Sequence, residues 1–96
     1  MKESNLIKAI SNYLKTVPNL FFWKEHGGMY GTAGIPDIIA CVDGRFVAFE
    51  VKTETGRLSR LQEVTLGRIR DAGGKAYMVR SAAEVAAIMK EMEVAG

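Results

Sequence analysis

The sequence predicts one α/β domain over residues 1–96, in which a mixed sheet is flanked by helices in the order α-β-β-β-α-β-α. Three observations carry this prediction. Apolar residues recur at helical spacing in three segments, short apolar runs typical of strands lie between them, and a two-residue turn signal joins two of those runs. A chain of 96 residues also has room for only one domain.

The first part of the chain is predicted to form a helix and then a strand. Apolar residues recur every three or four positions over residues 3–16, and a proline two residues later ends the pattern. Residues 20–24 are typical of an aromatic-rich strand, in which we expect Phe21, Phe22 and Trp23 to enter the core. A loop follows whose glycines leave its backbone free to turn: Gly27, Gly28, Gly31 and Gly34.

Two apolar strands, residues 37–42 and 45–53, are predicted to pair as a hairpin. The Asp43-Gly44 dipeptide between them is typical of a two-residue type I′ turn. Side chains alternate between the two faces of a strand, so one face of the second strand enters the core through Val47, Phe49 and Val51.

The last part of the chain adds a helix, a strand and a helix. Ser59 is the expected N-cap of a helix over residues 60–72, which ends before two glycines. A strand over residues 75–80 follows, and a capping box from Ser81 to Glu84 opens the last helix. Because the strands before and after the middle helix can pair in parallel, the sheet is expected to be mixed.

Composition excludes several classes of protein. Cys41 is the only cysteine, so it forms no internal disulfide, and we expect it to be buried and inert. No cysteine and histidine cluster suggests zinc, and no apolar run is long enough to cross a membrane. The sequence therefore predicts a cytoplasmic protein with no membrane partner and no small-molecule cofactor.

The predicted hairpin brings two carboxylates together. Its register places Asp37 opposite Glu50, and directly opposed Cβ atoms lie about 4.5–5.5 Å apart. Two carboxylates at that distance repel each other unless a divalent cation, which prefers oxygen ligands, lies between them. Strand alternation puts Lys52 on the same face. The competing interpretation is that Asp37 merely starts a strand and that Glu50 and Lys52 form a surface ion pair.

Two further polar residues face the same region. Glu3 begins the apolar stripe of the first helix, and it is either a third acidic group of the site or an ordinary first-turn acid favoured by the helix dipole. Gln62 shares a stripe with Leu66, so it faces inward, but it also completes a possible capping box with Ser59.

These residues resemble a known nuclease signature. Gly34-Ile35-Pro36-Asp37 followed by Glu50-Val51-Lys52 is similar to the PD-(D/E)xK motif, and the order of elements resembles the restriction-endonuclease-like αβββαβ core, here with a C-terminal helix added. Residues 34–40, 49–52 and 56–62 more narrowly resemble the virus-type replication-repair nuclease (VRR-NUC) domain, in its small stand-alone phage and bacterial form.

The resemblance implies an Mg²⁺- or Mn²⁺-dependent DNA endonuclease. The matching catalytic residues are Glu3, Asp37, Glu50, Lys52 and Gln62. The implied metal ligands are Asp37, Glu50 and the Val51 carbonyl, and Glu3 is implied to hold a second cation, directly or through water. Stand-alone members resemble junction resolvases, so we expect a homodimer that acts on branched DNA in replication, recombination or repair.

Residues 45–80 carry an excess of positive charge, which favours an anionic partner. The candidate phosphate contacts are Lys24, Arg57, Arg60, Arg68 and Arg70. Two other functions stay open at this point: a restriction-like endonuclease that cuts simple duplex DNA, and a DNA-binding module that does not cut.

Overall fold

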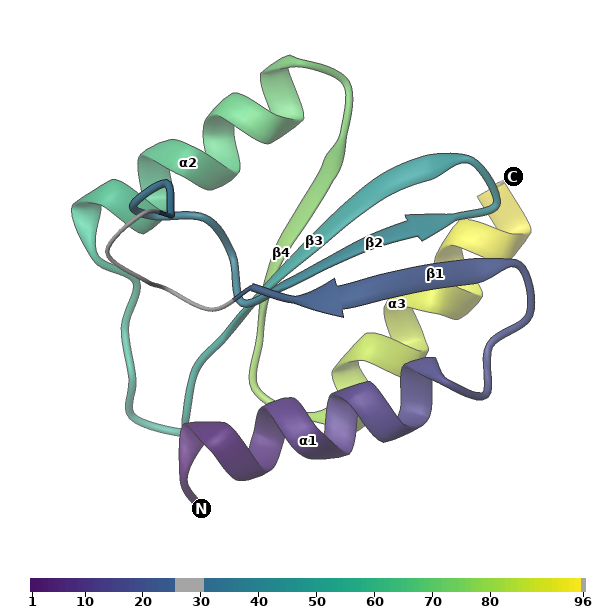
Figure 1. Cartoon of the computed structure of the whole chain (residues 1–96), viewed down its shortest axis with the longest axis horizontal. Helices are drawn as coiled ribbons and strands as arrows, with labels where there is room; N and C mark the ends of the chain where they lie inside the picture. Colours follow the sequence, from purple (N-terminus) through teal and green to yellow (C-terminus); the bar gives the residue numbers. More distant parts are fainter. Residues whose placement is uncertain (26–30, 96) are drawn as a thin grey trace.

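A computed structural model describes residues 1–25 and 31–95 and places a four-stranded sheet between helices (Figure 1). The elements are α1 (Glu3–Leu14), β1 (Leu20–Lys24), β2 (Ile38–Val42), β3 (Arg45–Val51), α2 (Arg60–Asp71), β4 (Lys75–Val79) and α3 (Ala82–Ala95). The strand order is β1-β2-β3-β4, with the first two pairings antiparallel and the last parallel. The predicted α/β fold with a mixed sheet is confirmed. In the described part of the chain, no helix is both long and apolar enough to cross a membrane.

The β2–β3 hairpin has the predicted register. Asp43 and Gly44 both have positive φ angles, 51° and 84°, as a type I′ turn requires. Val42 pairs with Arg45, and Ile38 pairs with Phe49. The ladder stops there, because β2 begins at Ile38. The predicted pairing of Asp37 with Glu50 within the strand ladder is therefore wrong, because Asp37 lies just before β2.

The sheet is covered unequally on its two faces. One face packs against α1 and α3 in the larger core cluster, where β3 contributes Val47, Phe49 and Val51 as predicted. The other face packs against α2 in a smaller cluster formed by Ile39, Ala48, Leu66 and Ala76. Figure 1 shows α2 on one side of the sheet and the other two helices opposite. The alternation along β3 consequently directs Ala48 and Glu50 to the α2 side. Lys52 lies just after the strand, but its N–H continues the pairing with β4, so the same alternation puts it on that side.

Three side chains expected in the interior are instead exposed. Phe21 and Trp23 are 69 % and 45 % exposed, and Cys41 is a free, exposed cysteine. Phe21 and Phe46 both pair with Cys41 across the sheet, so the three share one face. The smaller core cluster under α2 reaches only as far as Ile39, so it leaves this outer part of the face open. Leu20 and Phe22, on the opposite side of β1, do pack against the larger core.

The helix ends follow the sequence signals with small differences. α1 ends at Leu14, two residues before the predicted end, where the Lys15 N–H donates to the Ser11 carbonyl. The capping box of α2 is complete. At α3 the box is half formed: Ser81 Oγ accepts from the Glu84 N–H, but the Glu84 carboxylate accepts from the Arg80 N–H.

Gly34 holds the loop before Asp37 against α2. Its φ angle is +82°, and a Cβ at this position would lie 2.7 Å from Leu61 Cγ and 2.9 Å from Thr65 Oγ1. Only glycine combines this backbone conformation with so close an approach. The loop therefore enters β2 at a fixed position, which places Asp37. Gly27 and Gly28 lie outside the described residues.

Candidate active site

Asp37 and Glu50 meet where β2 begins and β3 ends. The Val51 N–H donates a 2.7 Å hydrogen bond to Asp37 Oδ2, which holds the aspartate carboxylate against β3. The Asp37 carbonyl accepts from the Glu25 N–H at 2.8 Å, so the residue is also fixed to the segment after β1. Asp37 lies outside the strand ladder, but hydrogen bonds from the backbone of two neighbouring segments hold it in place.

Glu50 is buried and carries a strongly raised pKa. Its side chain is 2 % exposed. Burial, then a hydrogen bond to Asp37 and the negative charge of Asp37, raise the Glu50 pKa from 4.5 to about 9. The Lys52 charge acts in the opposite direction, and the Glu3 charge raises the pKa further. Because Glu50 is buried, it does not form with Lys52 the surface ion pair that the competing interpretation predicts.

This donor set fits a hard divalent cation. A buried carboxylate beside a second carboxylate is unfavourable when both are ionised, and a cation between them reverses the sign of that interaction. The two groups offer oxygen atoms only, and oxygen is what Mg²⁺ and Mn²⁺ prefer. Asp37 and Glu50 are therefore the residues that would hold such an ion.

Glu50→Gln should stabilise the metal-free protein and flatten its pH dependence. The folded protein keeps the Glu50 proton up to about pH 9, whereas the unfolded chain releases it near pH 4.5. The folded state therefore binds more protons over this interval, and parent stability falls as pH rises through it. The glutamine does not titrate. At about pH 8 we expect its free energy of unfolding to exceed that of the parent by ~1–3 kcal/mol.

Denaturant unfolding in EDTA, followed by circular dichroism across this pH range, measures the effect. Glu91→Gln, which changes an exposed carboxylate of α3, is the matched control and should leave stability within about 0.5 kcal/mol of the parent. A Glu50→Gln protein less stable than the parent at high pH would contradict the assignment of a repelling, buried carboxylate.

Lys52 directly follows β3, on the same side as Glu50, and begins a loop that hydrogen bonds hold in place. Its N–H donates to the Val79 carbonyl at 3.0 Å, which extends the pairing with β4. The Arg80 guanidinium then binds carbonyls of the following loop, those of Thr53, Glu54 and Gly56. Sequence reasoning missed this role of Arg80, because these partners lie 24 to 27 residues away and no local motif announces them.

Gln62 forms the capping box with Ser59. Its Oε1 accepts from the Ser59 N–H at 2.9 Å, and its own N–H donates to Ser59 Oγ at 3.1 Å. The capping interpretation is therefore confirmed. The cap uses the amide oxygen of the side chain, and the amide NH₂ group makes no hydrogen bond within residues 1–25 and 31–95.

Glu3 lies at the start of α1 and acts on Glu50 through its charge. The structure does not gather it with Asp37 and Glu50 into one cluster of ligands. Across residues 1–25 and 31–95, no group of three or more histidine, cysteine, aspartate or glutamate side chains is arranged to hold a metal.

The five predicted phosphate contacts lie in different places. Lys24 is exposed at the end of β1, beside Asp37. Arg57 and Arg60 are exposed where the loop after Lys52 meets α2. Arg68 and Arg70 lie in the last turn of α2, near the start of β4 and away from the carboxylates. Arg70 Nε and Nη2 both donate to the Ala76 carbonyl, so this arginine ties α2 to β4.

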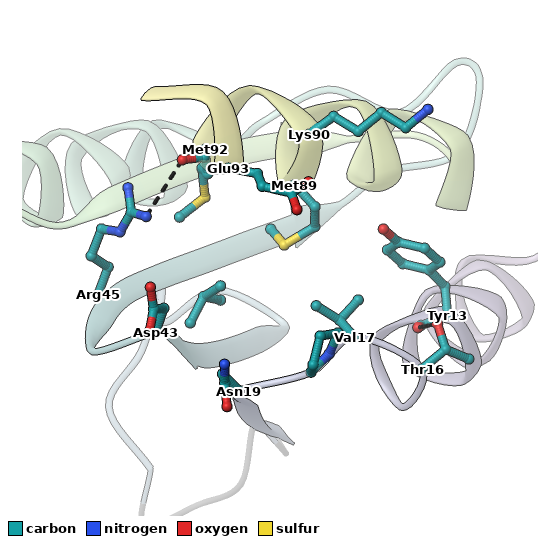
Figure 2. Close-up of a pocket in the computed structure, with 12 residues that line it drawn as sticks. Tyr13, Thr16, Val17, Asn19, Asp43, Arg45, Met89, Lys90, Met92 and Glu93 are labelled. Atoms are coloured by element: carbon teal, nitrogen blue, oxygen red, sulfur yellow. Dashed lines mark hydrogen bonds between the residues drawn. The ribbon is translucent and has the colours of Figure 1, made fainter. Parts of the chain in front are cut away.

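A cavity of about 400 Å³ lies at the other end of the hairpin (Figure 2). It is bounded by the end of α1, the Asp43-Gly44 turn and α3, where Arg45 Nη2 donates to the Met92 carbonyl at 3.4 Å. Asp37 and Glu50 lie at the opposite ends of β2 and β3. This cavity is therefore separate from the candidate site.

Comparison with known proteins identifies the family and the fold of the chain. The model of the VRR-NUC domain family matches residues 3–83, a range that contains every predicted catalytic residue. A solved structure titled as a VRR_NUC domain superposes with a TM-score of 0.76, at 21 % sequence identity, over 92 % of this chain and 94 % of that one. No curated protein matches the sequence. At this identity the solved structure shows a shared fold.

Proposed function

Because the chain belongs to the VRR-NUC family, which implies a nuclease of the PD-(D/E)xK type, we propose that it is an Mg²⁺- or Mn²⁺-dependent endonuclease acting on branched DNA. The observation that carries the proposal is the Asp37–Glu50 pair, in which a buried carboxylate is held beside a second one with Lys52 on the same face. We place its action in replication, recombination or repair, in the cytoplasm of a bacterial or phage-infected cell.

Each residue of the candidate site has its own role in this proposal. Asp37, Glu50 and the Val51 carbonyl would hold the cation, and Glu3 would hold a second cation, directly or through water. When bound, the cation supplies a Lewis acid that polarises the scissile phosphate and lowers the pKa of a water. Lys52 orients the attacking water or stabilises the negative charge that develops on the oxygens of the phosphorane. The Gln62 amide NH₂ group, left available by the cap, orients Lys52 or that water.

The reaction is a hydrolysis. The water oxygen bonds to phosphorus, the bond from phosphorus to the 3′ oxygen breaks, and that oxygen takes up a proton. The products are a 5′-phosphate and a 3′-hydroxyl. Lys24, Arg57, Arg60, Arg68 and Arg70 are proposed to contact phosphates of the substrate.

A panel of four-way junctions, flaps and linear duplexes, incubated with Mg²⁺, with Mn²⁺ or with EDTA, tests this function. We expect cation-dependent cleavage of a branched substrate in preference to the duplex. Equal cleavage of simple duplex would favour the restriction-like alternative. Binding of every substrate with cleavage of none would favour a non-catalytic DNA-binding module.

We also propose that the protein is a homodimer, because a junction needs two symmetric cuts and each chain carries one site. Exposed aromatic side chains on one face of the sheet support this: Phe21 and Trp23 on edge strand β1, whose rings lie 6.1 Å apart, and Phe46 on β3. An apolar surface of this kind is typical of contacts between proteins.

Light scattering should give the mass of two chains for the parent at micromolar concentration. It should give the mass of one chain for Phe21→Asp, because the new charge would be buried in the contact. A parent that cuts branched DNA while remaining monomeric would contradict the dimer.

A further inference from the structure

A second cavity leads away from the candidate site along α1. This groove, of about 480 Å³, runs between α1 and the end of β1 and reaches Asp37. We call it the lysine groove, because Lys8, Lys15 and Lys24 line it together with Ser11. None of the motifs that predict the active site includes Lys8, Ser11 or Lys15.

Helix geometry places three of these side chains in a row. Positions 8, 11 and 15 of α1 are separated by three and four residues and so lie on one face. Lys24 comes from the opposite wall, since it follows Leu20 and Phe22 on the side of β1 that faces α1. At 1.5 Å per residue, Lys8 and Lys15 are about 10 Å apart along the helix, which matches about three nucleotides of one strand at 3.4 Å each.

The Ser11 hydroxyl is a buried polar group that lacks a partner. Ser11 is 4 % exposed, and its Oγ finds no hydrogen-bond partner within the part of the chain that the structure describes. Leaving such a group unsatisfied costs free energy, so proteins normally pair it. Ser11 lines the groove, although its Oγ is itself buried, so a ligand oxygen lying there would accept the missing hydrogen bond once the side chain turns toward the groove.

The charge of the groove selects an anionic ligand. The three lysines are exposed and can reorient toward a ligand. They outnumber the two carboxylates of the lining, each of which is held by a hydrogen bond: Glu25 accepts from Trp23 Nε1 at 2.7 Å, and Asp37 accepts from the Val51 N–H. A chain of phosphates supplies both the negative charge that the lysines bind and the oxygen that Ser11 lacks.

We propose that the lysine groove holds the phosphate backbone of one DNA strand, beside the phosphate that is cut. Lys8, Lys15 and Lys24 bind phosphates of this strand, those bound by Lys8 and Lys15 being about three nucleotides apart, and the Ser11 hydroxyl donates to a phosphate oxygen. The proposal rests on the proposed nuclease function, and it names the path that the substrate strand takes away from Asp37. It predicts that contacts along α1 contribute to DNA affinity even when no cation is present.

Fluorescence anisotropy with a labelled four-way junction in EDTA tests the groove without catalysis. We expect the Lys8→Ala/Lys15→Ala double variant to bind at least about tenfold more weakly than the parent. Its slope of log affinity against log salt should fall by about 2, since each lost phosphate contact removes about 0.9. The matched control is Lys75→Ala/Lys90→Ala, which removes the same charge from exposed positions outside the groove and should keep the parent slope.

The Ser11→Ala variant distinguishes a serine that binds the ligand from one that only supports the fold. It removes an unsatisfied hydroxyl, so thermal stability should hold or rise, while junction affinity should fall several-fold. A merely structural serine would instead lower stability and leave affinity unchanged.

The outcomes also separate this inference from the proposed function. If the parent binds DNA but never cleaves it, the nuclease proposal fails, and loss of binding in the Lys8/Lys15 variant would still support the groove. If that variant binds with the parent affinity and salt slope, the groove proposal is overturned, whether or not the parent cleaves DNA. Equal weakening by the Lys75/Lys90 control would also overturn it, because only net charge would then matter.

Discussion

Asp37→Asn and Glu50→Gln should each lower Mg²⁺-dependent cleavage by at least about 10³-fold, which corresponds to the several kcal/mol that a correctly held metal ion supplies. Each change replaces a carboxylate by an amide of similar shape. In the Asp37→Asn variant the amide oxygen can still accept from the Val51 N–H, so the fold should persist. Single-turnover cleavage of a labelled four-way junction measures the rate, and anisotropy in EDTA should show that DNA binding is retained.

The matched control is Asp43→Asn in the turn of the same hairpin. The change is chemically identical, but it lies at the end of β2 remote from Glu50, and asparagine accepts the positive φ angle of 51° found there. This variant should cut at the parent rate. Full activity of either Asp37→Asn or Glu50→Gln would show that the two carboxylates do not hold the metal.

Lys52→Ala should slow single-turnover cleavage by ~10²-fold or more while leaving metal affinity near that of the parent. An amine is not a ligand of Mg²⁺, so its loss removes no coordination. It does remove a preorganised positive charge, and losing one such group costs about this factor. Lys52→Arg should restore only part of the rate, because a planar guanidinium donates differently from a compact ammonium.

Calorimetric titration with Mn²⁺ and single-turnover kinetics together measure the two effects. Lys90→Ala, on α3 at the far cavity, is the control and should change neither. If Lys52→Ala cuts the junction at the parent rate, Lys52 has no part in catalysis and its match to the nuclease motif is coincidental.

Local signals in the sequence were sufficient for much of the fold. Asp43-Gly44 fixed the hairpin register, because both residues accept the positive φ angles of a type I′ turn. Alternation along β3 then separated Val47, Phe49 and Val51 from Glu50, since side chains on a strand point to opposite faces. The prediction for Asp37 failed only in detail: the residue precedes β2, and its carboxylate accepts a hydrogen bond from the Val51 N–H while still lying beside Glu50.

Other features depend on contacts that no local pattern contains. The alternation of side chains along the strands shows that Phe21, Trp23 and Cys41 share a face of the sheet. It does not show that α2, which packs on that face, leaves these three side chains uncovered. The hydrogen bonds of Arg80 to the loop after Lys52 join segments that meet only in the folded chain. The same holds for the lysine groove, which forms where α1 passes the end of β1.

The central claim is that Asp37 and Glu50 hold a divalent cation, and the anomalous signal of Mn²⁺ in crystals soaked with that ion tests it most directly. The account predicts a peak within about 2.0–2.6 Å of carboxylate oxygens from both residues, and near the Val51 carbonyl. The same crystals of Asp37→Asn should lack the peak. A peak bound by other residues, or none at this pair in a protein that cleaves DNA with Mn²⁺, would contradict the account.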